Sequence, residues 1–196
     1  MAGLVKVITG EMFSGKSQEL ARLIGESLGQ GLEVQVFYPA HAARGSHRDI
    51  DQRLSSIRGE GKLTLHPVPG GNAQYIADWT RCTTDVIAID EAQFFSDDIV
   101  PVVKSLRREG KLVLIGGLDQ DYLEHPFGRM GDLMCIANDV VKVHTFCASC
   151  RQDDAYISHR VTREQDQVVI GDNYIPLCED CYLLATNGQA IPLFVD

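Results

Sequence analysis

Near the N-terminus, two glycines, a lysine and a serine are spaced as phosphate binding requires. Residues 10–17 fit the pattern G-x-x-x-x-G-K-[ST], in which backbone N–H groups and a helix N-terminus surround a chain of phosphates. A chance match in a chain of this length occurs about once in a hundred sequences. We therefore interpret these residues as a nucleotide-binding loop, called the phosphate loop below, rather than a simple glycine turn. Its members are Gly10, Glu11, Met12, Phe13, Ser14, Gly15, Lys16 and Ser17.

Within this loop the glycines and the two polar side chains have separate predicted tasks. Gly10 and Gly15 allow the backbone to approach phosphate oxygens closely. Lys16 is expected to reach the β and γ phosphates, and the hydroxyl of Ser17 to bind Mg²⁺.

Two adjacent carboxylates follow an apolar run at residues 86–89. Asp90 and Glu91 would then lie at the carboxyl end of a strand, where open parallel sheets place their ligand-binding groups. We expect Asp90 to hold the Mg²⁺ shell and Glu91 to accept a proton from an attacking hydroxyl group. The alternative, a helix-capping role, is less favoured because Asp97 and Asp98 lie nearer the next predicted helix. The nearby Phe94 is compatible with core packing or with stacking on a planar base.

Four cysteines form two C-x-x-C pairs separated by twenty-seven residues. This spacing is typical of a tetrahedral Cys₄ zinc site, whereas a thioredoxin-like redox site needs only one pair. Four cysteines fill the tetrahedral coordination of zinc and leave no position open for water or substrate, so we expect a structural rather than a catalytic Zn²⁺ ion. His144 is an alternative ligand because it lies close to the first pair. The predicted ligands are Cys147, Cys150, Cys178 and Cys181.

The hydrophobic pattern predicts an α/β fold with a mainly parallel sheet and helices on both faces. A helix should begin after the glycines of the phosphate loop and end near Gly29, and another should span about 99–106, with Asp97 or Asp98 capping its start. We expect a long irregular loop at 38–71, which is rich in proline, glycine and charge. The predicted strands are 4–8, 33–37, 86–89, 112–115 and 140–143.

The character of the chain changes after residue 144. Beyond this point the helical pattern disappears, and strand-like residues near 167–170 lie between the two cysteine pairs. We therefore predict a nucleotide-binding domain at 1–144 and a small zinc-binding domain at 145–196.

Composition excludes several classes of protein. The chain has 196 residues, a formal net charge of −9 and no run near the roughly 18 apolar residues of a membrane span. The N-terminus lacks the pattern of a secretory signal, so we expect a cytoplasmic protein. The negative charge and the lack of a basic, aromatic-rich cluster argue against a nucleic acid polymer as partner.

The order of the motifs resembles the type II thymidine kinases. The resemblance rests on GEMFSGKS at 10–17, DEAQFF at 90–95, GLDQDYLEHPFG at 117–128 and the paired C-x-x-C motifs, and it covers nearly the whole chain. It implies an ATPase-like parallel-sheet domain, followed by a zinc-bearing lasso domain that closes over the nucleoside. It also implies a homotetramer.

The resemblance further implies roles for individual residues. Lys16 and Ser17 would serve ATP and Mg²⁺, Asp90 would lie with the metal, and Glu91 would be the base on the nucleoside 5′-hydroxyl. Two departures stand out: Glu11 replaces a frequent Pro and adds a negative charge beside the phosphates, and Ile157 replaces a frequent Thr. The residues that match nucleoside-contacting positions are Met12, Phe94, Leu118, Tyr122, Phe127 and Tyr174.

We therefore expect phosphoryl transfer from ATP to the 5′-hydroxyl of thymidine, giving thymidine monophosphate and ADP. One alternative is an ATP-hydrolysing switch whose zinc domain binds a protein partner. Another is a kinase for deoxyuridine or a different deoxynucleoside, because a single methyl group changes discrimination by only about 1–3 kcal/mol.

Overall fold

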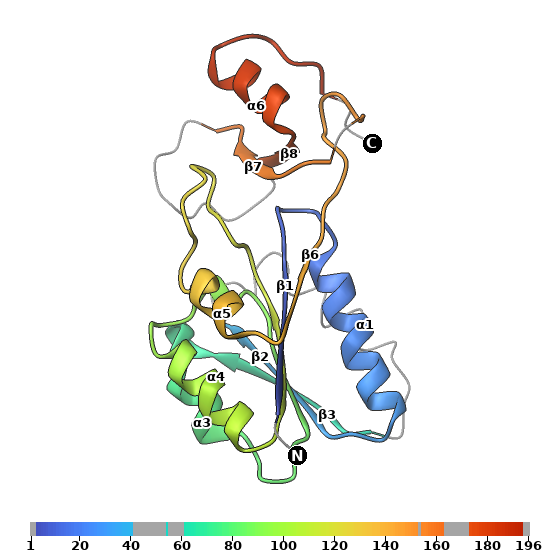
Figure 1. The fold of residues 1–196 in the computed structure, drawn as a ribbon, viewed down its shortest axis with the longest axis vertical. Coiled ribbons are helices and arrows are strands. Elements are labelled where there is room, and N and C mark those ends of the chain that lie inside the picture. The colour runs from blue at the N-terminus through green and yellow to red at the C-terminus, as the bar shows by residue number, and fades with distance from the viewer. Residues whose placement is uncertain (1–2, 41–53, 55–60, 153, 163–172, 194–196) are drawn as a thin grey trace.

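A six-stranded parallel sheet forms the centre of the larger part of the molecule (Figure 1). The computed structural model describes residues 3–40, 54, 61–152, 154–162 and 173–193. The strand order is β3-β2-β4-β5-β1-β6, and every neighbouring pair runs parallel. The strands of this sheet are β1 (Leu4–Thr9), β2 (Val34–Pro39), β3 (Leu63–Val68), β4 (Val86–Ile89), β5 (Leu112–Gly116) and β6 (Asp139–Lys142).

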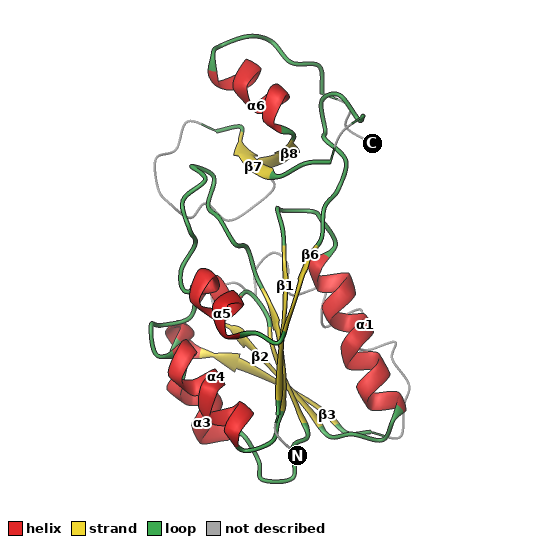
Figure 2. Ribbon diagram, viewed as in Figure 1, coloured by secondary structure: helices red, strands yellow, loops and turns green. Residues whose placement is uncertain are grey.

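Helices cover both faces of this sheet, as the hydrophobic pattern predicts. Helix α1 lies on one face, and α3, α4 and α5 lie on the other (Figures 1 and 2). Two 3₁₀ turns, η2 and η3, follow β3 and β4. The bounds are α1 (Lys16–Gly29), η2 (Pro69–Gly71), α3 (Gln74–Trp79), η3 (Ala92–Phe94), α4 (Ile99–Arg108) and α5 (Met130–Ile136).

Each face of the sheet carries its own apolar core, because successive side chains of a strand point to opposite faces. Val113 and Ile115 of β5 pack with α4, whereas Leu114 packs with Leu20 and Ile24 of α1. Strands that are buried on both faces explain why the central runs are almost continuously apolar.

The four paired cysteines belong to a smaller unit beyond the carboxyl ends of the strands (Figure 1). It contains an antiparallel pair, β7 (Ile157–Arg160) and β8 (Tyr174–Leu177), and helix α6 (Glu179–Thr186). We call these elements and the turn Cys147–Cys150 the cysteine module. Its apolar cluster includes the cysteines themselves and is separate from the two sheet cores.

Several expectations about local structure were wrong. The region 38–71 contains β3 (Leu63–Val68), which tolerates Pro67 because it is an edge strand. The rest of the predicted loop at 41–53 and 55–60 lies outside the described residues. The cysteine module contains helix α6 where the sequence showed no helical pattern.

Three further expectations concern the start of α4, the stretch at 167–170 and the length of the helices. Asp98 precedes α4, but its side chain makes no capping hydrogen bond, so that part of the prediction was wrong. The predicted strand-like stretch at 167–170 lies outside the described part of the chain. Among the described residues, none of the helices has the length and apolar character needed to cross a membrane.

Candidate active site

The phosphate loop connects the end of β1 to the start of α1, as its sequence pattern requires. Gly10 and Gly15 both have positive φ values, 141° and 89°, which favour glycine. The carbonyl oxygen of Glu11 accepts hydrogen bonds from Lys16 Nζ at 2.6 Å and from Ser14 Oγ at 2.7 Å. These bonds fold the loop back on itself and hold the lysine over it.

The ammonium group of Lys16 lies among carboxylates. Burial lowers the pKa of Lys16, and the negative charges of Glu91, Glu11, Asp90 and Asp119 act in the opposite direction. The site thus combines one lysine with four acidic groups from three segments of the chain.

The side chain of Glu11 does not point toward the centre of the loop. Its Oε1 accepts a hydrogen bond from the Thr145 backbone N–H at 2.7 Å, and Oε2 lies 3.1 Å from His144 Nδ1. The Glu11 carboxylate is therefore held by His144 and Thr145, in the segment that leads from the sheet to the cysteine module.

Asp90 and Glu91 follow β4 directly, as predicted. Asp90 is buried, and burial raises its pKa to about 8, with the neighbouring charge of Glu91 adding to the shift and Lys16 opposing it. A carboxylate that is costly to ionise alone is suited to binding a divalent cation, which would stabilise its charged form. Asp90 therefore fits the Mg²⁺ role chemically.

Glu91 is positioned by a neighbour that the sequence reasoning did not select. Gln93 is buried, and its Nε2 donates a hydrogen bond to Glu91 Oε2 at 2.5 Å. Gln93 Oε1 accepts one from the Leu118 backbone N–H at 3.1 Å. The amide therefore links the acidic pair to the loop at 117–128.

The structure brings together part of the predicted nucleoside set close to this amide. Phe94 and Phe127 form an edge-to-face pair with ring centroids 5.4 Å apart. Gly128 has a φ of 54°, and a Cβ atom there would lie 2.2 Å from the Gln93 carbonyl oxygen. The 117–128 loop thus packs directly on the turn that carries Glu91.

A second group of predicted residues meets around Arg160 of the cysteine module. The Arg160 guanidinium carbon lies 3.6 Å from the centre of the Tyr122 ring, and Nη2 donates to the Tyr174 hydroxyl at 2.6 Å. Arg160 itself is only 6% exposed. Sequence reasoning missed it, because an isolated arginine carries no recognisable motif.

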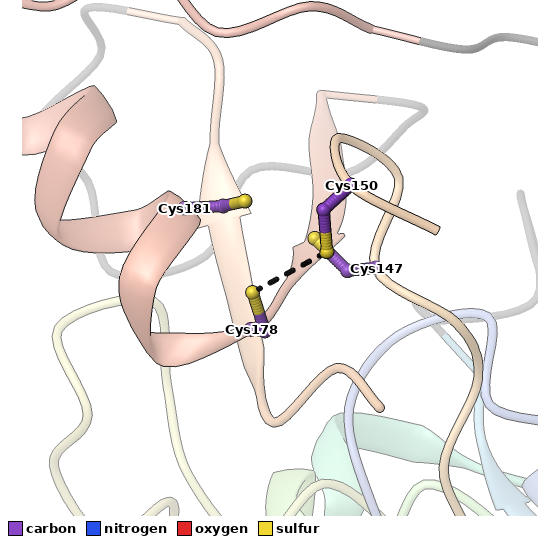
Figure 3. A group of neighbouring side chains, drawn as sticks. All are labelled: Cys147, Cys150, Cys178 and Cys181. Atoms are coloured by element: carbon purple, nitrogen blue, oxygen red, sulfur yellow. Dashed lines mark hydrogen bonds between the residues drawn. The ribbon is translucent and has the colours of Figure 1, made fainter. Parts of the chain in front are cut away.

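The four cysteines converge as their spacing predicts (Figure 3). All four sulfur atoms lie within 4.8 Å of one another, and Cys150 Sγ lies 3.8 Å from Cys178 Sγ. Tetrahedral Zn²⁺ with Zn–S bonds of about 2.3 Å places its sulfur ligands about 3.8 Å apart, so the donor set and its dimensions fit zinc.

One of these thiols is already prepared for ionisation. Burial opposes ionisation of Cys147, but backbone N–H groups of Cys150, Cys178 and Ser149 outweigh it and lower the Cys147 pKa to about 7. Burial raises the pKa of Cys178 to about 12, and neighbouring thiols contribute. His144 contacts Glu11 and the Ala155 carbonyl and is not a member of the described cysteine cluster.

Comparison with known proteins decides the family. The model of the thymidine kinase family matches residues 3–182. The chain belongs to the thymidine kinase family. Relatives named thymidine kinase occur in Bacteroides thetaiotaomicron, 38% identical over 96% of this chain and 92% of that protein, and in Mycoplasma mobile, 34% identical over 92% and 88%. A thymidine kinase of a Rhodothermus species is 37% identical over 92% of this chain and 81% of that protein.

The thymidine kinase family assignment confirms the resemblance drawn from the motifs. Met12 of this family member is half-buried and donates its backbone N–H to Ser158 Oγ at 2.9 Å, while the Phe13 side chain is 57% exposed. Apart from Met12, the residues predicted to contact the nucleoside therefore form two groups. Phe94, Leu118 and Phe127 lie around Gln93, and Tyr122 and Tyr174 lie around Arg160. Met12 joins the phosphate loop to the second group, because its partner Ser158 lies on β7, the strand that also carries Arg160.

Proposed function

We propose that this protein is a thymidine kinase that transfers the γ-phosphoryl group of ATP to the 5′-hydroxyl of thymidine. The observation that carries the proposal is that the phosphate loop after β1, with Lys16, and the acidic pair after β4 both lie at the carboxyl edge of one parallel sheet, where β1 and β4 flank β5. Phosphoryl transfer needs a cation at the transferring group and a base at the acceptor, and these residues supply both. The family membership supplies the acceptor class.

In the proposed reaction, the protein acts mainly by positioning and by charge. The phosphate loop binds the triphosphate through its backbone N–H groups, and Lys16 exchanges its contact with the Glu11 carbonyl for phosphate oxygens. Glu91, held by Gln93, orients the nucleoside 5′-hydroxyl and accepts its proton as the oxygen attacks. When bound beside Asp90 and Ser17, Mg²⁺ would neutralise charge on the phosphates.

The aromatic and apolar residues near Gln93 suit a planar base and a sugar. Phe94, Leu118 and Phe127 would pack against the nucleoside, with Met12 beside the phosphate loop. Tyr122 and Tyr174, which Arg160 holds in place, would line the side of the site formed by the cysteine module. Covering the site in this way would exclude water, the competing acceptor.

We further propose that residues 1–144 form the kinase domain and 145–196 a zinc-binding domain with a structural Zn²⁺ ion. A reducing compartment, the cytoplasm, suits a set of four thiol ligands. The resemblance also favours a homotetramer, which light scattering of the purified protein would test.

The direct test is a turnover assay with Mg-ATP and a panel of thymidine, deoxyuridine, deoxycytidine and purine deoxynucleosides. Preferred phosphorylation of thymidine supports the proposal. Preference for another deoxynucleoside would reassign the acceptor while keeping the kinase. Hydrolysis of ATP to ADP and inorganic phosphate, without phosphorylation of any nucleoside in the panel, would favour the alternative of an ATP-driven switch.

A further inference from the structure

Three consecutive residues of the phosphate loop contact the chain that leads into the cysteine module. A Cβ atom on Gly10 would lie 2.0 Å from the Val143 carbonyl oxygen, so only glycine permits this approach. Glu11 binds His144 and Thr145 through its carboxylate, and Met12 binds Ser158 of β7 through its backbone N–H. The loop is therefore joined to both the connection and the module.

Glu11 supplies the charged group among these contacts. Its side chain is fully buried, and a buried carboxylate is tolerated only when hydrogen-bond donors compensate for lost water. One oxygen accepts the Thr145 N–H at 2.7 Å, and the other faces His144 Nδ1 at 3.1 Å. The same His144 atom lies 3.1 Å from the Ala155 carbonyl oxygen, so the contact extends to the residues just before β7.

The backbone of Glu11 meanwhile serves the phosphate loop. Its carbonyl oxygen accepts the hydrogen bonds of Lys16 Nζ and Ser14 Oγ, which belong to the groups that would turn to bound phosphates. A change at the loop that moves this carbonyl must also move, or strain, the carboxylate four bonds away. The backbone of Glu11 thus contacts the phosphate loop, while its side chain contacts the connection to the cysteine module.

From this arrangement we propose that Glu11 is a positioning residue that couples nucleotide binding in the phosphate loop to the order of the cysteine module. The inference rests on the proposed nucleotide binding but requires no particular acceptor. A nucleotide that binds more tightly to the phosphate loop when Glu11 contacts His144 and Thr145 must, by linkage, also stabilise the cysteine module in that contact. The role depends on an acid in the second position of the loop.

Hydrogen exchange of the metal-loaded protein, with and without Mg²⁺ and a non-hydrolysable ATP analogue, tests the coupling. In the unsubstituted protein, the analogue should slow exchange of the β7 amides, Ile157–Arg160, by about 5-fold or more, the lower end of typical site-to-site coupling. Glu11→Ala should still bind the analogue by calorimetry but lose this slowing. Glu11→Gln should retain part of it, because its amide oxygen can still accept the Thr145 N–H.

Two further variants make the result specific. Glu26→Ala removes an exposed glutamate of α1 whose described ion pair is with Arg22, and should leave the slowing unchanged. Ser158→Ala removes the partner of the Met12 N–H and should weaken the slowing through this neighbouring contact. If Glu11→Ala does not fold, Glu11→Gln decides the matter, because slowing equal to that of the unsubstituted protein in this variant would overturn the inference.

Equal slowing in Glu11→Ala and the unsubstituted protein would overturn the inference. Saturated binding of the analogue without any slowing in the unsubstituted protein would also overturn it while leaving the proposed function intact. Absence of analogue binding would overturn both. Phosphoryl transfer to nucleosides is measured separately, so its failure alone would leave the coupling standing.

Discussion

At the scale of single residues, the acidic pair after β4 is the centre of the proposed chemistry. The two carboxylates are adjacent in sequence but differ in environment: Asp90 is buried, whereas Glu91 is half-buried and receives a hydrogen bond from Gln93. Different environments allow adjacent acids to perform different tasks, one with a metal and one with a proton.

Replacement of Glu91 by Gln should leave nucleotide binding nearly intact and lower turnover by about 10²–10⁴-fold, the usual effect of removing a general base. The amide keeps the size of the side chain but cannot accept the proton. Steady-state kinetics and calorimetry with an ATP analogue would measure the two quantities. Glu109→Gln at the exposed end of α4 is the matched control, and turnover close to normal in Glu91→Gln would remove Glu91 from this role.

Replacement of Gln93 by Leu should lower both turnover and stability. The variant loses the donor that orients Glu91 and leaves the Leu118 N–H without its acceptor. Loss of an acceptor for such a group costs about 1–3 kcal/mol of unfolding free energy, which urea unfolding would measure. Unchanged stability together with unchanged turnover would show that Gln93 does not support the site.

Residue types and spacing predict the acidic pair, the phosphate loop and the cysteine ligands, because each is a local motif. They did not predict Gln93 or Arg160, whose importance comes from contacts between distant segments. Arg160 meets Tyr122 across 38 positions of sequence, and no local pattern encodes that distance. Residue type alone is also a weak guide to burial. The structure exposes Cys82, Cys135 and Trp79, although cysteine and tryptophan favour burial.

At the scale of elements, the central strands are the most predictable part of the fold. Runs such as 86–89 and 112–115 are apolar on both faces because helices cover both faces, and length separates them from helices. The edge strand β3 escaped prediction because it carries polar residues and Pro67, features that an edge tolerates and a loop shares. Helix α6 is short and directly follows Cys178, so its hydrophobic pattern is weak.

The buried end of β4 should make stability depend on pH. The pKa of Asp90 is raised to about 8 in the folded protein, above its ordinary value, so the folded state binds a proton that the unfolded state has released. Between about pH 4 and 8 the folded protein holds more protons, and its stability from this group therefore falls as pH rises through that window. Below about pH 4 both states are protonated, and the contribution is fully present.

Without nucleotide or Mg²⁺, the thermal midpoint of Asp90→Asn should fall less between about pH 5 and 9 than that of the unsubstituted protein. The asparagine cannot ionise, so the proton-linked term disappears. Scanning calorimetry in matched buffers would measure both curves. Parallel curves for the two proteins would contradict a raised Asp90 pKa.

At the scale of the whole molecule, two units with separate apolar clusters meet over the carboxyl ends of the strands (Figure 1). The larger one supplies the phosphate loop and acids, and the smaller one supplies Arg160, Tyr174 and the cysteines. Three of the four buried residues of the smaller cluster are cysteines, so we expect metal to contribute much of its stability.

Metal analysis should find about one Zn²⁺ per chain, and chelation or Cys178→Ser should loosen the cysteine module while leaving the parallel sheet folded. Exchange of the β7 and β8 amides would report the module and that of β4 and β5 the sheet. Cys82→Ser, at an exposed thiol outside the cluster, should keep both the metal and the module. A module that resists chelation unchanged would argue against a structural zinc ion.

The most direct test of the central claim follows the label of [γ-³²P]ATP in the presence of Mg²⁺ and thymidine. The account predicts that the label appears on the thymidine 5′-oxygen, at a rate that falls by orders of magnitude in Glu91→Gln. Label released only as inorganic phosphate, with none on thymidine or any other deoxynucleoside offered, would contradict it.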